Sequence, residues 1–245
     1  MRDYALEAKN RVEFIQNILS VAQAEGIVFG SSGGKDSALV GILCKMACDN
    51  TLGLIMPCGS KRNYEVDRTD AEILAKQFNI TTRIIDLSDV KEKLVHTVGE
   101  VTKLNDSALI NIAPRLRMTT LYAVAAGENR LVAGTGNRSE EYMGYFTKWG
   151  DGAFDFNPIA DLTVTEIYEF LHFLDAPECI IRKAPSAGLF DGQTDENDMG
   201  VTYRSIDNFL LAGTVNERDE AVIKRFHQSS EHKRKPPVVF GKEQV

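Results

Sequence analysis

The sequence contains no long apolar run, only four cysteines and no excess of basic residues. None of its apolar runs approaches the roughly 20 residues that cross a bilayer, which argues against a membrane protein. The N-terminal segment Met1-Arg2-Asp3-Tyr4 lacks the apolar core of a secretion signal. The formal net charge of −7 argues against general nucleic-acid binding, which usually requires a basic face. We therefore expect a cytoplasmic protein that binds neither membranes nor nucleic acids.

The four cysteines, Cys44, Cys48, Cys58 and Cys179, do not have the spacing of zinc ligands. Cys44 and Cys48 are explained as small apolar residues of a helix in a reduced interior. With 245 residues, of which 43% are hydrophobic and 26% charged, the chain is long enough to bury one large core. No repeat or Pro/Gly-rich linker divides it, so we expect a single domain over residues 1–245.

Short apolar runs alternate with longer amphipathic segments along the chain. The runs are predicted to be buried strands, at 27–29, 52–56, 82–85 and 131–133. The amphipathic segments are predicted helices, at 7–24, 38–48, 65–78, 113–126, 163–174, 203–211 and 217–228. This alternation favours an α/β fold, an open parallel sheet of Rossmann-like type with helices on both faces. Two long irregular segments, 137–158 and 184–200, are predicted to be functional loops.

The most informative segment is Gly30-Ser31-Ser32-Gly33-Gly34-Lys35-Asp36-Ser37, which lies between a predicted strand and a helix. Its glycines allow the backbone to approach an anion closely, and the N–H groups at the start of the helix favour phosphate. Asp36 does not fit beside phosphate unless a divalent cation lies between them. The segment therefore predicts a nucleotide that is bound together with Mg²⁺.

Two other motifs overlap this segment. A Walker A loop requires four residues between its first glycine and Gly-Lys-Ser/Thr, and here three residues separate Gly30 from Gly34. The segment also satisfies G-x-S-x-G, the nucleophile elbow of α/β-hydrolases, but a suitable histidine after it is lacking. A glycine turn without a ligand is the remaining structural explanation.

The stretch from Ser32 to Ser37 matches the SGGxDS signature of the N-type ATP pyrophosphatases (PP-loop family), which it resembles. That resemblance implies cleavage of ATP between its α and β phosphates, with AMP transferred to an acceptor. Later segments resemble the ammonia-dependent NAD synthetases within this family: Asn111 to Met118, Gly134 to Gly152, Pro185 to Glu196, and Ser230 to Arg234.

The resemblance implies a reaction and its participants. Deamido-NAD would be adenylated by ATP with Mg²⁺ on its nicotinate carboxylate, and free ammonia would then displace AMP to form NAD. Pyrophosphate is the other product, and this is the final step of NAD biosynthesis. Glutamine-dependent relatives carry an additional amidase domain that this sequence does not show, so we expect ammonia to be the nitrogen donor. The resembled enzymes are homodimers, and a homodimer is expected here.

The site residues follow from the same resemblance. The expected ATP contacts are Gly30, Ser31, Ser32, Gly33, Gly34, Lys35, Asp36, Ser37, Thr135 and Ser186. The expected metal ligands are Asp36 and Glu140. The expected deamido-NAD contacts are Arg115, Tyr122, Lys148, Asp155, His232 and Lys233. Asp151 is the candidate catalytic residue, which would orient ammonia or accept a proton from it.

Each of these residues also has a plain structural explanation. Asp36 suits the start of a helix, Glu140 a solvated loop, Tyr122 a packed helix face and Asp151 a turn between glycines. The sequence also departs from the family pattern, because Val164 stands where many members have a phosphate-contacting lysine. Either another cation replaces that lysine, with Lys183 as the candidate, or the phosphates rely on Mg²⁺.

Other functions remain open from the sequence. Two belong to the same chemistry, a GMP synthetase-type amidating domain and a tRNA thiolase. The thiolase is disfavoured by the acidic net charge and by the lack of a second cysteine near the site. A nucleotide-binding sensor without catalysis is the alternative of another class.

Overall fold

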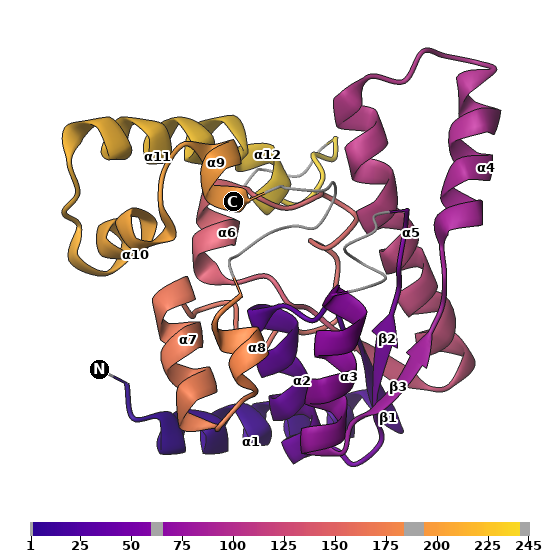
Figure 1. The fold of residues 1–245 in the computed structure, drawn as a ribbon, viewed down its shortest axis with the longest axis vertical. Coiled ribbons are helices and arrows are strands. Elements are labelled where there is room, and N and C mark those ends of the chain that lie inside the picture. The colour runs from indigo at the N-terminus through magenta and orange to yellow at the C-terminus, as the bar shows by residue number, and fades with distance from the viewer. Residues whose placement is uncertain (1, 60–65, 184–193, 241–245) are drawn as a thin grey trace.

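Parallel strands form the centre of the structure, a computed structural model that describes residues 2–59, 66–183 and 194–240 (Figure 1). Among these residues, the strands are β1 (Gly26–Gly30), β2 (Thr51–Ile55), β3 (Thr81–Ile84) and β4 (Arg130–Ala133). They form one sheet in the order β3-β2-β1-β4. Ile27 pairs with Thr51 on one side and with Leu131 on the other, so β1 is central. The site-bearing loop after β1 therefore lies at the carboxyl edge of the sheet.

Helices cover both faces of this sheet, as predicted. The helices of the first half are α1 (Tyr4–Ala22), α2 (Lys35–Ala47), α3 (Arg68–Phe78), α4 (Ser88–Gly99) and α5 (Asp106–Gly127). Those of the second half are α6 (Arg138–Met143), α7 (Val164–Phe173), α8 (Glu178–Ile181), α9 (Asp195–Met199), α10 (Tyr203–Ala212), α11 (Glu217–Ser229) and α12 (Glu231–Arg234). In Figure 1 the hairpin of α4 and α5 projects on one side, and α10 and α11 lie on the other.

Alternation along β1 distributes its side chains between two cores. Ile27 and Phe29 pack with α1, α2, α7 and α8 on one face of the sheet. Val28 points to the opposite face, where it packs with residues of β2 and α5. All three side chains are fully buried. The apolar run that predicted this strand is continuous because both of its faces are covered.

A third cluster joins the helices that follow the sheet. Met143 of α6, Val164 of α7, Ile206 of α10 and Ile223 of α11 pack together. This cluster fixes α6 against α7, α10 and α11, and α6 carries Glu140, which lines the cavity described below. The cluster thus connects the second half of the chain to the carboxyl edge of the sheet.

The predicted strands and long helices are confirmed, but several helices were missed. Helix α4 was missed although Val90, Leu94 and Val98 recur along it at helical spacing, and none of its residues is buried. The segments 137–158 and 184–200 were predicted to be irregular, which is wrong in part because they contain the short helices α6 and α9. Helix α5 begins at Asp106, seven residues before the predicted start at 113, and it carries Pro114 inside it.

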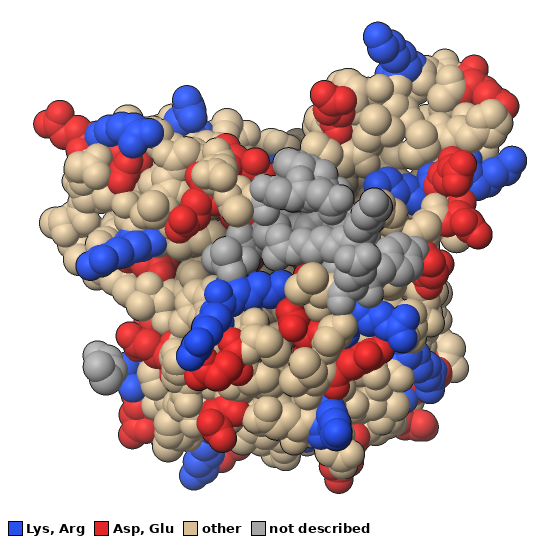
Figure 2. All heavy atoms as spheres, in the orientation of Figure 1, with Lys and Arg blue, Asp and Glu red and all other residues tan. Residues whose placement is uncertain are grey.

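The surface carries charges of both signs. On the face shown in Figure 2, Lys and Arg side chains are interspersed with Asp and Glu, without a continuous basic area. Within the described residues, no helix is both long and apolar enough to cross a bilayer.

Candidate active site

The loop between β1 and α2 is held by its own serines. Ser37 Oγ accepts a hydrogen bond from the Ser32 N–H at 3.3 Å, lies 3.0 Å from Ser32 Oγ, and donates to the Gly34 carbonyl at 3.0 Å. Gly34 is the N-cap of α2 and has no side chain with which to cap that helix. The start of α2 therefore presents backbone N–H groups, an arrangement suited to a phosphate group.

Gly33 allows the β1–α2 loop to pack against the segment of the chain around Asp67. Its φ of +69° lies in the left-handed region, and a Cβ there would meet the Asp67 carbonyl oxygen at 2.2 Å. Lys183 secures the same turn, since its Nζ donates to the Gly33 carbonyl at 3.1 Å and to Asp70 at 2.7 Å. Lys183 also forms an ion pair of 2.7 Å with Asp67. The lysine that was the candidate phosphate contact thus lines the cavity and also holds the loop through Gly33, Asp67 and Asp70.

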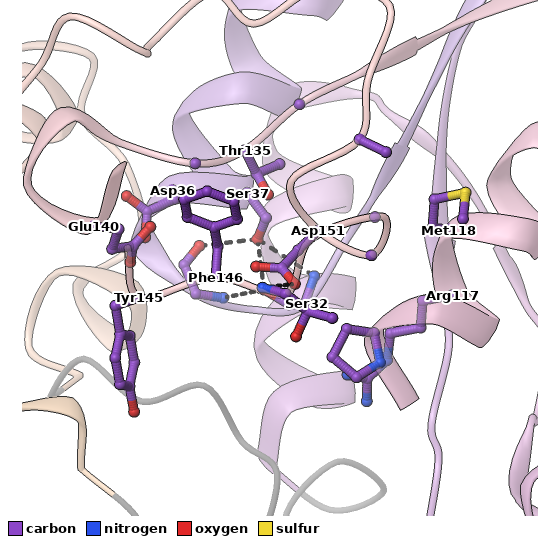
Figure 3. A pocket seen from close by; sticks show the side chains of 18 of the residues that line it. Ser32, Asp36, Ser37, Arg117, Met118, Thr135, Glu140, Tyr145, Phe146 and Asp151 are labelled. Carbon is purple, nitrogen blue, oxygen red and sulfur yellow. Dashed lines mark hydrogen bonds between the residues drawn. The ribbon is translucent and has the colours of Figure 1, made fainter. Parts of the chain in front are cut away.

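The loop opens into a cavity of about 840 Å³ (Figure 3). Its walls come from many places along the chain: the β1–α2 loop, the end of β2, the start of α3, the middle of α5, the segment from Val132 to Ala153, Lys183, α9 and the C-terminal helices. Of the predicted site residues, the walls include Gly30, Ser31, Ser32, Gly34, Lys35, Asp36, Ser37, Thr135, Glu140, Asp151 and Lys233. Residues separated by up to two hundred positions therefore surround one space.

The two predicted metal ligands lie together at one end of the cavity, with Arg117 and Met118 at the other (Figure 3). The ammonium group of Lys35 lies 2.7 Å from Asp36 Oδ2 and 3.9 Å from Glu140 Oε1. Asn137 orients both acids, because its Nδ2 donates to Asp36 Oδ1 at 3.0 Å and its Oδ1 accepts from the Glu140 N–H at 3.0 Å. We call this group of Lys35, Asp36, Asn137 and Glu140 the carboxylate corner.

Burial and neighbouring charges shift the titration of the corner. Burial, and then the charge of Asp36, raise the pKa of Glu140 to about 8, although Lys35 opposes this shift. Burial alone would lower the pKa of Lys35, but the carboxylates of Asp36 and Glu140 outweigh it and raise that pKa. The corner therefore holds a lysine ammonium and a carboxyl group that readily retains a proton while no other cation is present.

The donor set of the corner suits Mg²⁺ that arrives with a nucleotide. Among the residues the structure describes, no group of three or more His, Cys, Asp or Glu side chains could hold a metal ion by itself. Mg²⁺ commonly binds one or two carboxylates and completes its coordination with phosphates and water. Asp36 and Glu140 supply two such carboxylates beside the phosphate-binding loop, and they fit this mode.

Asp151 lines the same cavity as the carboxylate corner. Its Oδ1 accepts a hydrogen bond of 3.0 Å from the Thr147 N–H. The carboxyl group is reached by solvent from the cavity but is surrounded by protein on its other sides, and this desolvation raises its pKa. Lys233 and Arg117 oppose that shift by their charge.

Most of the predicted dinucleotide contacts lie outside the cavity wall. The Arg115 guanidinium faces the Lys148 carbonyl at 3.4 Å, and Lys148 Nζ donates to the His232 carbonyl at 2.6 Å. Tyr122 donates to Asp155 at 3.1 Å, and burial together with that carboxylate raises the pKa of Tyr122 to about 12. These five residues form two groups, Arg115 with Lys148 and His232, and Tyr122 with Asp155. Their contact with deamido-NAD stays a prediction.

Lys233 is the predicted dinucleotide contact that reaches the cavity. Its Nζ donates to the carbonyl groups of Gly144 and Phe146 at 2.8 Å each. Ser186, the last of the predicted ATP contacts, lies outside the described residues. Val164 is buried at the start of α7, where its N–H points to Ser139 Oγ at 3.4 Å.

The structure adds two residues that the sequence reasoning did not select. Asn137 had a local signal, since Asn137 and Glu140 have the spacing of a capping box and do form one at the start of α6. Arg117 lines the cavity, whereas the chosen Arg115 is exposed. Burial lowers the pKa of Arg117, and its Nε donates to the Met56 carbonyl at 3.1 Å. The register of these arginines on α5 was decided by packing.

The fold and this geometry define a nucleotide-binding α/β protein whose ligand lies at the carboxyl edge of a parallel sheet. The sequence profile of the NAD synthase family matches residues 7–237. An NH3-dependent NAD+ synthetase from Carboxydothermus hydrogenoformans is 47% identical over 231 residues, which cover 93% of this chain and 94% of that protein. The chain belongs to the NAD synthase family.

Solved structures of related proteins have the same fold. An NMN synthetase from Francisella tularensis superposes with a TM-score of 0.93 at 37% identity, covering 99% of this chain and 100% of the other. An NH3-dependent NAD synthetase from Campylobacter jejuni superposes with a TM-score of 0.79 at 32% identity, covering 98% and 100%.

Proposed function

We propose that this protein uses ATP and free ammonia to convert the nicotinate carboxylate of deamido-NAD to the amide of NAD, releasing AMP and pyrophosphate. The observation that carries the proposal is the carboxylate corner beside an open phosphate-binding loop, in a chain that belongs to the NAD synthase family. The sensor alternative does not require Asp36 and Glu140 to be held together by a dedicated asparagine.

The first step brings an anionic carboxylate to an anionic triphosphate, so its barrier is largely electrostatic. The N–H groups at the start of α2 and the serine hydroxyls of the loop would bind phosphate oxygens. Asp36 and Glu140 would hold Mg²⁺, which neutralises phosphate charge when bound. Arg117 and Lys233 add positive charge along the cavity wall for the second substrate.

The second step requires neutral ammonia next to the adenylated carbonyl carbon. Asp151 would orient ammonia or accept its proton, because its carboxyl group is accessible from the cavity and has a raised pKa. No nucleophilic side chain is needed, since AMP is already a good leaving group. A carboxylate in this position acts in its deprotonated form.

The test is product analysis after incubation with ATP, Mg²⁺ and deamido-NAD, with either ammonium or glutamine as nitrogen donor. We expect NAD, AMP and pyrophosphate in equal amounts with ammonium, and none with glutamine. Pyrophosphate without NAD would leave the ATP chemistry intact and point to another acceptor. A lack of ATP consumption would favour the sensor.

A second candidate substrate is the nicotinate mononucleotide. It is favoured by one observation, the TM-score of 0.93 to a protein described as an NMN synthetase, against 0.79 to an NH3-dependent NAD synthetase. Amidation of the mononucleotide is the same reaction at the same carboxyl group. Competition between the mononucleotide and deamido-NAD in one reaction, followed as NMN against NAD, decides which substrate has the higher kcat/KM.

We also propose a cytoplasmic homodimer. The four cysteines are free thiols, as is usual in a reducing compartment. The α4–α5 hairpin exposes the apolar side chains of Val90, Leu94, Val101 and Ile110, and Ile110 also lines the cavity. A second copy on this hairpin would cover apolar surface next to the site. Light scattering should give twice the mass of 27.2 kDa, and Leu94→Asp should give the monomer.

A further inference from the structure

Lys35 occupies the variable position of the SGGxDS signature, and its side chain is buried. It is the first residue of α2, and its ammonium group points into the carboxylate corner instead of toward solvent. Its Nζ also lies 5.4 Å from the centre of the Tyr203 ring, on α10. The corner thus contains a cation supplied by the chain itself, at the position between the two acids.

This placement has an electrostatic cost. A positive charge at a helix N-terminus is opposed by the helix dipole, and burial of an ammonium group is unfavourable unless carboxylates compensate for it. At Lys35 the compensation comes from Asp36 at 2.7 Å, from Glu140 at 3.9 Å and from the face of Tyr203. The lysine is therefore bound to the same two carboxylates that would bind a metal ion.

We propose that Lys35 is a positioning residue that acts as a resident cation of the carboxylate corner. It holds Asp36 and Glu140 together and prevents them from binding a divalent cation until a nucleotide brings phosphate oxygens. This inference rests on the proposed function in one respect, the role of Asp36 and Glu140 as metal ligands.

The charges of the corner explain this order. Even with both acids ionised, the two carboxylates and the lysine sum to only one negative charge, too little to neutralise a divalent cation. Without the lysine they sum to two, which matches the cation. Nucleotide phosphates supply the additional negative charge, so a divalent cation and the lysine can then be held together.

Mn²⁺ is the probe, because its free aquo ion is measured directly by electron paramagnetic resonance without turnover. Removal of a like charge about 4 Å from the ion strengthens Mn²⁺ binding without nucleotide by about tenfold or more in Lys35→Met. Lys35→Arg keeps the charge and should bind Mn²⁺ as weakly as the wild type. Lys45→Met is the matched control, since Lys45 is on the same helix and pairs with exposed Asp49.

A second measurement separates charge from packing. Without metal, Lys35→Met should have a melting temperature well below that of the wild type, because the substitution leaves Asp36 and Glu140 close together without their cation. The double variant that carries both Lys35→Met and Glu140→Gln should recover most of the decrease in melting temperature. If Lys35→Met does not fold alone, recovery of folded protein in the double variant is the same test.

The proposal is overturned if Lys35→Met binds Mn²⁺ no more tightly than Lys45→Met, or if Glu140→Gln does not restore stability. A nonhydrolysable ATP analogue separates this failure from that of the metal site itself. One outcome is that the wild type binds Mn²⁺ in the presence of the analogue while Lys35→Met, in its absence, binds Mn²⁺ no more tightly than the wild type. In that case only the proposed role of Lys35 is wrong. If wild type binds no Mn²⁺ with the analogue, the metal ligands of the proposed function fail as well.

Discussion

The side chain of Asn137 is hydrogen-bonded to Asp36, a residue 101 positions earlier, through a contact of 3.0 Å between Nδ2 and Oδ1. The same amide caps α6 by accepting the Glu140 N–H. One residue therefore starts the helix that carries Glu140 and also orients the carboxylate that faces it. The Asn137 side chain thus contributes both to the stability of α6 and to the orientation of the carboxylate corner.

Asn137→Ser and Asn137→Ala distinguish these two roles. Serine still caps α6 but is too short to reach Asp36, whereas alanine does neither. We expect both variants to lose about tenfold in kcat, since a charged hydrogen bond contributes about 1.5–3 kcal/mol. We also expect Asn137→Ala to unfold with about 1 kcal/mol less free energy than Asn137→Ser. Urea titration and steady-state kinetics measure both, and a fully active serine variant would contradict the orienting role.

Glu140→Gln tests the metal-binding corner against Glu141→Gln, its exposed neighbour on α6. The amide keeps the size of the side chain but removes the charge that would bind the cation. We expect a loss of about 100-fold or more in pyrophosphate release for Glu140→Gln, and none for Glu141→Gln. Asp36→Asn should behave as Glu140→Gln does. Unchanged activity of either variant at low Mg²⁺ would refute its role as a ligand.

Lys183→Met tests whether the β1–α2 loop depends on the lysine that is hydrogen-bonded to Gly33. The variant loses the hydrogen bond to the Gly33 carbonyl and the cation shared by Asp67 and Asp70. We expect the KM for ATP to rise by about tenfold, while kcat changes less, because a charged hydrogen bond is lost from the binding loop. Lys183→Arg is the conservative control. An increase in KM for deamido-NAD alone would place Lys183 at the other substrate.

Asp151→Asn tests the proton acceptor. Asparagine keeps an oxygen for the Thr147 N–H, so the turn should stay intact. If Asp151 acts as a base, the wild-type rate falls as pH drops through its raised pKa, and the variant loses both this dependence and about 100-fold in kcat. The dependence that comes from protonation of ammonia at higher pH should remain. A variant with normal kcat and an unchanged pH profile would make Asp151 a structural residue of the turn.

The ion pair of Asp161 leads to a prediction of how the free energy of unfolding depends on pH. It pairs with buried Arg11 at 2.7 Å. Burial alone would raise its pKa, but the Arg11 hydrogen bond and charge, with a further contribution from Arg2, lower it. An acid with a lowered pKa stabilises the fold above its unfolded pKa of about 3.9, and this contribution is lost as pH falls through the folded pKa.

Asp161→Asn should therefore unfold with about 1 kcal/mol less free energy than wild type at pH 7, because buried Arg11 keeps fewer charged partners but solvent screens the half-exposed Asp161 carboxylate. The difference should become smaller below pH of about 4. Urea titrations at the two pH values measure this. Asp49→Asn, at an exposed pair on α2, should change neither value. A difference that is independent of pH would show that shape, and not charge, is responsible.

The sequence allowed much of the fold and part of the site to be predicted because those signals are local. The strand with Ile27 and Phe29 was found from its apolar run, and the Gly33 turn from its glycines, since both depend on neighbouring residues. Helix α4 was missed although its signal is also local, since Val90, Leu94 and Val98 recur at helical spacing; the structure shows that this apolar face is not buried. Which of Arg115 and Arg117 lines the cavity could not be predicted either, because positions two apart on a helix face different directions and only packing selects between them.

The sequence by itself determined the chemistry at each position: a glycine turn for phosphate, two acids for a cation and a lysine between glycine and acid. Only the tertiary structure decided that Asn137 contacts Asp36, that the Lys35 ammonium group lies close to both acids and that Lys183 is hydrogen-bonded to the loop at Gly33. The physical reason is that these contacts join residues 101, 105 and 150 positions apart. Their geometry is set by the sheet and the helices packed on it, not by the order of residues along the chain.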